Sequence, residues 1–194
     1  MFDHWTLKKR LTLTFAALLV VATALIAVAL TSSARLREAV HWNAHTYKVL
    51  NTAQDMLLNM VNIETGLRGF VAGGNEKFLE PYNGGLKAFE TAFAEAKTLT
   101  SDNPAQQGRL DSMLAAHKQF MAVAQALVTL RREATAGTVP VDTLLREFGA
   151  GKDKLAMDAF RTGVADFMKT EQTLLDTRSA DLEASMAANR TTLL

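Results

Sequence analysis

The first apolar feature of the chain is a continuous run near its N-terminus. Residues Leu11 to Leu30 are apolar apart from three threonines. At about 1.5 Å per residue, a helix of this length spans roughly 30 Å, which is the hydrocarbon thickness of a bilayer. The pattern therefore predicts a transmembrane helix. We place it at residues 11–33, after a cytoplasmic tail at residues 1–10.

A cleaved signal peptide is the alternative interpretation of this run. The small residues Ser32 to Ala34 fit a cleavage site, but the apolar core of a signal peptide usually has about 7–15 residues. The longer run favours an uncleaved anchor in the bacterial inner membrane. The basic cluster Lys8 to Arg10 favours a cytoplasmic N-terminus, because lysine and arginine are enriched on that side. Residues from about 34 onward would then lie in the periplasm.

Beyond residue 35 the apolar residues recur in steps of three and four, as on one face of a helix. The first such series is Val49, Ala53, Met56, Met60, Ile63, Leu67 and Phe70. Similar series follow at 79–96, 110–127 and 157–167. Steps that average about 3.5 residues are typical of helices packed in a left-handed bundle.

Glycine, proline and short polar clusters divide this pattern. Breaks at 73–75, 101–104 and 137–140 predict helices over 35–72, 77–100, 104–136 and 141–194, the last with a weak point at 149–151. Short connections make sequential helices antiparallel neighbours. The predicted fold is all-α: an N-terminal transmembrane helix, then an up-down-up-down four-helix bundle with long first and fourth helices. We interpret residues 34–194 as a periplasmic domain truncated before a second transmembrane helix.

Composition excludes several functional classes. Lys and Arg number 21 against 20 Asp and Glu, so a clustered basic face for nucleic acid is not indicated. The absence of cysteine excludes disulfides, thiolate metal sites and cysteine nucleophiles. The sequence has no phosphate-binding loop, nucleophile elbow or His-Glu metal motif. We therefore expect no cofactor and no enzymatic activity, and place any kinase or cyclase activity in a missing C-terminal module.

One stretch resembles a known family. Residues 64–82 follow the pattern Glu-Thr-Gly-x-Arg-Gly-aromatic, a short glycine-containing turn, then Phe-Leu-x-Pro-Tyr, which is similar to the motif of CHASE3 extracellular sensors. The matching residues are Glu64, Thr65, Gly66, Arg68, Gly69, Phe78, Leu79, Pro81 and Tyr82. A second similar stretch lies within 152–178. The resemblance implies a periplasmic four-helix sensor in a bacterial transmembrane receptor for signal transduction.

The resemblance does not identify the output module of the receptor. We expect the parent to be a methyl-accepting chemotaxis protein, with a histidine kinase or a diguanylate cyclase as alternatives. Other interpretations are a ligand-free membrane-anchored scaffold that dimerises, or a secreted helical binding protein freed by signal cleavage. The expected partners are a second copy of the chain, the inner membrane, and a small anionic ligand or a periplasmic protein, with no nucleic acid.

Four charged residues are the candidate ligand-binding site. Glu64 and Arg68 stand one turn apart on the first helix, and Glu171 and Arg178 lie on the fourth. We predict a polar layer between these helices with an Arg68–Glu171 ion pair, which fixes helix register. The alternative is that Arg68 or Arg178 holds an anionic ligand, because guanidinium binds carboxylates bidentately.

Glycines and histidines complete the set of candidates. Gly66 and Gly69 destabilise a helix interior by about 1 kcal/mol each, so we expect close helix approach there, with a hinge as the alternative. His41 and His45 lie one turn apart, but we expect no metal site. His117, in the apolar series of the third helix, is expected to be buried and hydrogen-bonded.

Overall fold

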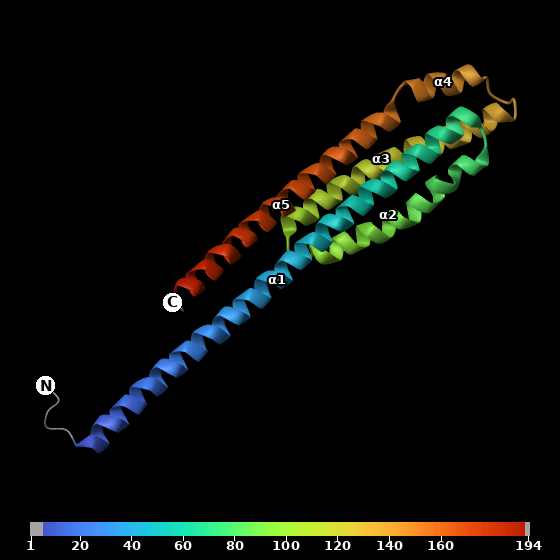
Figure 1. The fold of residues 1–194 in the computed structure, drawn as a ribbon. Helices are drawn as coiled ribbons and strands as arrows, with labels where there is room; N and C mark the ends of the chain where they lie inside the picture. The colour runs from blue at the N-terminus through green and yellow to red at the C-terminus, as the bar shows by residue number, and fades with distance from the viewer. Residues whose placement is uncertain (1–5, 193–194) are drawn as a thin grey trace. The chain divides into compact units, whose positions relative to one another are not determined.

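The computed structural model describes residues 6–192 and divides into two compact units. The bundle unit comprises His45–Leu175, and the terminal unit comprises the residues before and after it. The helices are α1 (Leu7–Gly73), η1 (Glu76–Phe78), α2 (Leu79–Leu99), α3 (Pro104–Thr135), α4 (Val141–Gly149) and α5 (Lys152–Thr192) (Figure 1). Both α1 and α5 contribute residues to each unit.

The all-α prediction is confirmed, and residues 6–192 contain no strand. The predicted transmembrane and first bundle helices form one continuous α1. The predicted last helix divides at its weak point into α4 and α5, because Gly151 adopts a φ of +67°, which favours glycine. The side chain of Asn103 caps α3 by accepting a hydrogen bond from the Gln106 amide, and Pro104 occupies its first turn.

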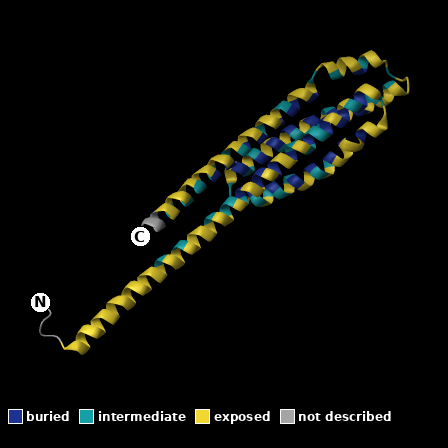
Figure 2. Cartoon of the chain, in the orientation of Figure 1, coloured by how far each residue is buried: buried dark blue, intermediate teal, exposed yellow. Residues whose placement is uncertain are grey.

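The bundle unit is built around aromatic and methionine side chains from α1, α2, α3 and α5. Figure 2 shows the buried residues concentrated on the sides of these helices that face one another. All seven members of the first apolar series are buried. The largest fully buried side chains are Phe70, Phe89, Phe120, Phe160, Phe167, Met56, Met60, Ile63, Leu67, Leu110, Met113 and Leu144.

The N-terminal part of α1 is apolar and exposed. Its most apolar window of 18 residues has a mean hydropathy of 2.7, and none of that window is buried. The hydroxyls of Thr12, Thr14 and Thr23 donate to backbone carbonyls one turn earlier, at 2.8–3.0 Å. These polar groups are thus satisfied within the helix, as a lipid environment requires. This segment is long and apolar enough to cross a bilayer, and its boundaries at residues 11 and 33 stay predictions.

Candidate functional site

Four charged side chains connect α1 and α5 inside the bundle unit, and we call them the α1–α5 cluster. Glu64 and Arg68 come from α1, and Asp153 and Arg161 come from α5. The Nη2 atom of Arg68 lies 3.1 Å from Oε1 of Glu64 and 3.2 Å from Oδ2 of Asp153. Nη2 of Arg161 donates to Oε2 of Glu64 at 2.7 Å. Arginine therefore neutralises each carboxylate, and Glu64 contacts both arginines.

The two carboxylates of the cluster are much more buried than the two arginines. The side chains of Glu64 and Asp153 are 6% and 3% exposed, whereas those of Arg68 and Arg161 are 44% and 43% exposed. Burial of an unpaired carboxylate is strongly unfavourable, so each needs its guanidinium partner. These contacts form a polar layer between α1 and α5, and its role in fixing helix register stays a prediction.

The predicted Arg68–Glu171 ion pair is wrong, because Arg68 contacts Asp153 instead. Asp153 precedes Glu171 by 18 residues, or about 27 Å along the helix. The Gly151 turn places the start of α5 beside the last turns of α1, and this sets which residues of the two helices meet. Counting from that turn would have pointed to Asp153 and Arg161.

Glu171 connects α5 to α3 rather than to α1. It is buried, with 4% of its surface exposed. Nε2 of Gln106 donates to the Glu171 carboxylate at 2.6 Å and to the Phe167 carbonyl at 3.2 Å. Nη1 of Arg109 in turn donates to Oε1 of Gln106 at 3.2 Å. Glu171 is therefore part of a buried hydrogen-bond chain.

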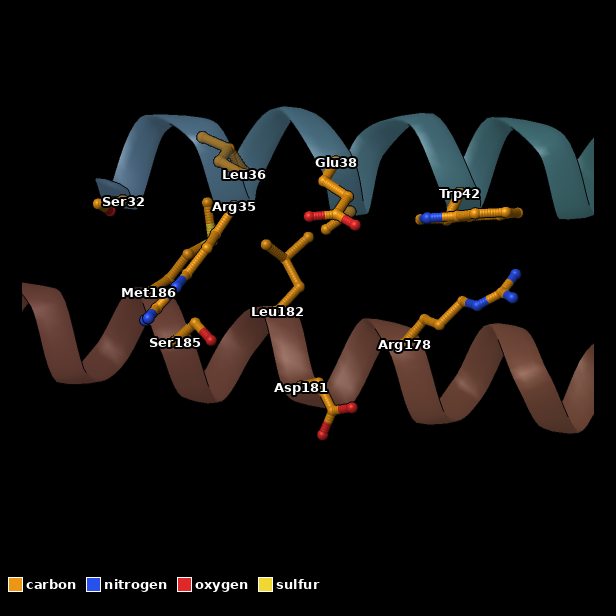
Figure 3. Close-up of a pocket in the computed structure, with 11 residues that line it drawn as sticks. Ser32, Arg35, Leu36, Glu38, Trp42, Arg178, Asp181, Leu182, Ser185 and Met186 are labelled. Carbon is orange, nitrogen blue, oxygen red and sulfur yellow. The ribbon is translucent and has the colours of Figure 1, made fainter. Parts of the chain in front are cut away.

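Arg178 lies in the terminal unit, where it faces α1. Its guanidinium carbon is 4.9 Å from the centroid of the Trp42 ring, a cation–π arrangement. Both residues line a groove of about 690 Å³ together with Glu38, Asp181 and Leu182, and Figure 3 shows Arg178 extending toward Trp42 from the opposite helix. The four predicted site residues thus lie at three separate places, and ligand binding by any of them stays a prediction.

The glycines of the motif allow α1 and α2 to approach closely. A Cβ atom on Gly66 would lie 2.7 Å from the backbone nitrogen of Tyr82 and 2.9 Å from the carbonyl oxygen of Phe78. A Cβ on Gly69 would lie 2.9 Å from the Phe78 ring. Gly85 on α2 is equally close to the Asn59 carbonyl of α1, at 2.8 Å. The predicted close approach is confirmed, and it explains the joint presence of glycines and Phe78 in the motif.

His117, which was predicted to be buried, is half-buried in the bundle. Its ring stacks on Phe89 with a centroid separation of 4.0 Å, and Nδ1 lies 3.0 Å from the sulfur of Met60. Burial lowers the pKa of His117 to about 4, and the charge of Lys118 adds to this effect. The imidazole is therefore neutral at pH 7. His41 packs edge-on against Trp42 at 5.8 Å.

The fold and this cluster define a helical bundle whose first and last helices are joined by buried charges. The model of the CHASE3 domain family matches residues 39–181, which is about three quarters of the chain. The chain therefore belongs to the CHASE3 family, whose members are extracellular sensor domains. The matched region contains both the motif and the α1–α5 cluster.

A solved structure has the same fold. The crystal structure of the Rhodopseudomonas palustris histidine kinase HK9 sensor domain matches with a TM-score of 0.60 and 20% identity. The match covers 68% of this chain and 98% of that one. At this level of identity the similarity concerns the fold alone. Comparison with curated proteins gives no match.

Proposed function

We propose that this chain is the extracytoplasmic sensory part of a bacterial transmembrane receptor, anchored in the inner membrane by the apolar part of α1. The observation that supports it most is the α1–α5 cluster within a CHASE3 domain. The cluster joins the helix that contains the apolar run to the last helix of the chain. We assign no catalysis to these residues.

In this proposal the signal is a displacement of α5 against α1. Packed helices switch between discrete arrangements that differ by about 1–2 Å. Arg68 lies between a carboxylate on its own helix and one on α5, so a shift of α5 lengthens one contact while the other remains. The partly exposed guanidinium can follow such a shift without leaving both carboxylates unpaired.

The output module is a separate part of the proposal. We propose a methyl-accepting chemotaxis protein first and a histidine kinase second, the latter because a histidine kinase sensor domain shares the fold. Membranes that contain the natural gene product would be incubated with labelled ATP or with S-adenosylmethionine and a receptor methyltransferase. Glutamyl methylation supports the first output and histidine phosphorylation the second. A protein with neither reaction favours the remaining alternatives, a diguanylate cyclase or the ligand-free scaffold.

Cysteine labelling tests the extracytoplasmic location, because the chain has no cysteine of its own. Thr6→Cys precedes the apolar run, and Ser112→Cys lies at an exposed position of α3. A membrane-impermeant maleimide applied to cells with a permeabilised outer membrane should label Ser112→Cys, and should label Thr6→Cys only after lysis. The reverse pattern contradicts the proposal. Loss of the Thr6→Cys segment from the mature protein identifies a cleaved signal.

A further inference from the structure

A cavity of about 340 Å³ is lined by residues of η1, α2 and α3. Its apolar lining residues are Leu79, Leu86 and Val128, and its polar ones are Glu76, Tyr82, Asn83, Gln125, Thr129 and Arg132. Most ligand sites have volumes of about 300–1,000 Å³. The volume of this cavity therefore suits a small metabolite, and its mixed lining suits one with both apolar and polar groups.

Tyr82 provides the first polar group. The residue lines the cavity and is 7% exposed, and among residues 6–192 its hydroxyl has no hydrogen-bond partner. The hydroxyl oxygen is not buried, so it is open to a ligand at the cavity surface. Burial also raises the pKa of Tyr82, so the phenol keeps its proton at neutral pH and can donate it to a ligand. The glycine contacts involve the Tyr82 backbone and Cβ and leave the role of this hydroxyl unexplained.

Arg132 provides the second polar group. Its Nε and Nη2 atoms donate to the two carboxylate oxygens of Glu76 at 2.8 and 2.9 Å. Guanidinium has five N–H groups, and no bond from Nη1 to any described residue is present. The bidentate bond to Glu76 therefore holds the guanidinium in place and leaves its Nη1 edge for another acceptor. A group fixed before binding loses less entropy when the ligand arrives.

The charges at the cavity restrict the class of ligand. Arg132 favours an anion, whereas Glu76 beside it repels additional negative charge. Such repulsion gives specificity against ligands with more than one negative charge. A monoanion satisfies both conditions better than a phosphate or a dicarboxylate does. The three apolar lining residues, Leu79, Leu86 and Val128, favour a ligand with a hydrocarbon body.

We propose that this cavity binds a small monocarboxylate with an apolar body. The carboxylate accepts hydrogen bonds from Nη1 of Arg132, the body lies against Leu79, Leu86 and Val128, and the Tyr82 hydroxyl gives a further hydrogen bond to the ligand. The biological meaning of the site rests on the proposed sensory function, but the binding itself does not.

Isothermal titration calorimetry on residues 1–194 in lipid nanodiscs tests the site, with empty nanodiscs subtracted. The probes are phenylacetate and 4-methylpentanoate, each compared with its neutral amide. We expect saturable binding of at least one carboxylate, with its amide about tenfold weaker or more, because a hydrogen bond to a charged group is stronger than one between neutral groups. Absence of saturable binding by both carboxylates, or equal binding of acid and amide, overturns the proposal.

Matched variants locate the binding. Arg132→Gln should weaken it about tenfold and Tyr82→Phe about fivefold, as expected for a charged and a neutral hydrogen bond. Arg146→Gln and Tyr47→Phe make the same changes at exposed positions outside the cavity and should leave affinity unchanged. Circular dichroism checks that each variant is folded. Binding that survives both cavity variants overturns the assignment of the site.

The two proposals fail in distinguishable ways. If phenylacetate binds and the cysteine labels place Ser112 in the cytoplasm, the sensory proposal fails and the binding site stands. If the labels show the expected topology and no probe binds, the site alone is refuted.

Discussion

Two groups of ion pairs in the bundle unit have similar distances and different surroundings. Arg161 lies 2.7 Å from Glu64, and Arg132 lies 2.8 Å from Glu76. The Glu64 side chain is 6% exposed, whereas that of Glu76 is 60% exposed. Exposed pairs contribute little to stability because water screens them, while a buried carboxylate depends on its partner. Distance alone therefore does not reveal the role of an ion pair.

This difference separates two sides of the bundle. On the α1–α5 side, buried carboxylates form ion pairs within α1 and between the two helices. On the α2–α3 side, an exposed pair stands at the edge of a cavity. We expect changes along α1 to reduce stability, and changes at the cavity to affect ligand binding alone. The following predictions test that division, from the largest expected effect to the smallest.

Gly66→Ala should have the largest effect. The added Cβ would meet backbone atoms of α2 and η1 at 2.7–2.9 Å, and backbone cannot move aside as a side chain can. We expect a loss of about 2–3 kcal/mol in the free energy of unfolding, typical of overpacking, measured by chemical denaturation. Gly84→Ala is the matched control, because nothing lies within 4 Å of its Cβ. It should stabilise α2 by up to about 1 kcal/mol, and equal losses in both variants would contradict the packing argument.

Arg68→Met should reduce stability by about 2 kcal/mol. The substitution leaves Asp153 buried without its arginine, while Glu64 keeps Arg161. Breaking a fully buried pair usually destabilises by roughly 3–5 kcal/mol, and the partial exposure of Arg68 lowers that figure. Arg146→Met at an exposed position of α4 serves as the control in urea unfolding. If both variants lose the same stability, the cluster has no special structural role.

Acidification should destabilise the bundle through His117. Its pKa is about 4 in the folded protein against an ordinary value near 6.5, so the unfolded chain binds the proton first. Above about pH 7, His117 is therefore uncharged in both states and does not make stability depend on pH. As the pH falls from there toward 4, the free energy of unfolding decreases. His117→Phe should reduce the fall in Tm between pH 7 and pH 5 by a few degrees. An unchanged pH dependence would show that the imidazole is not involved.

Arg132→Gln should leave Tm unchanged. Arg132 and Glu76 are both exposed, and screened pairs of this kind are close to neutral for stability. The bidentate bond lowers the pKa of Glu76, but the carboxylate is ionised at pH 7 with or without its partner. Thermal melts at pH 7 compare this variant with the parent chain. A clear fall in Tm would place this pair among the structural ones.

Helix boundaries were predictable because local chemistry sets them. Gly74 and Gly151 adopt positive φ after α1 and α4, and Asn103 caps α3. Each helix end is therefore determined by residues within a few positions of it. The apolar series predicted the core for the same reason, since each position depends on its own helix face. Close approach at Gly66 was likewise visible in the sequence.

The partners of the charged residues depended on helix register, which no single segment determines. From the sequence alone, Arg68 could pair with an acidic residue anywhere along α5. The position of the Gly151 turn brings Asp153, rather than Glu171, next to Arg68. Asp153 resembles an ordinary acidic residue in the first turn of a helix. Tyr82 falls within the apolar series at 79–96, but the cavity that it lines is formed by three separate elements.

A double-mutant cycle tests most directly whether the α1–α5 cluster couples the two helices. Arg68→Met, Asp153→Asn and the double variant are unfolded in urea alongside the parent chain, and the same is done for Arg132→Gln with Glu76→Gln. We predict a coupling energy of about 1 kcal/mol or more between Arg68 and Asp153, and none outside experimental error between Arg132 and Glu76. Absence of coupling in the first cycle, or equal coupling in both, would contradict the account.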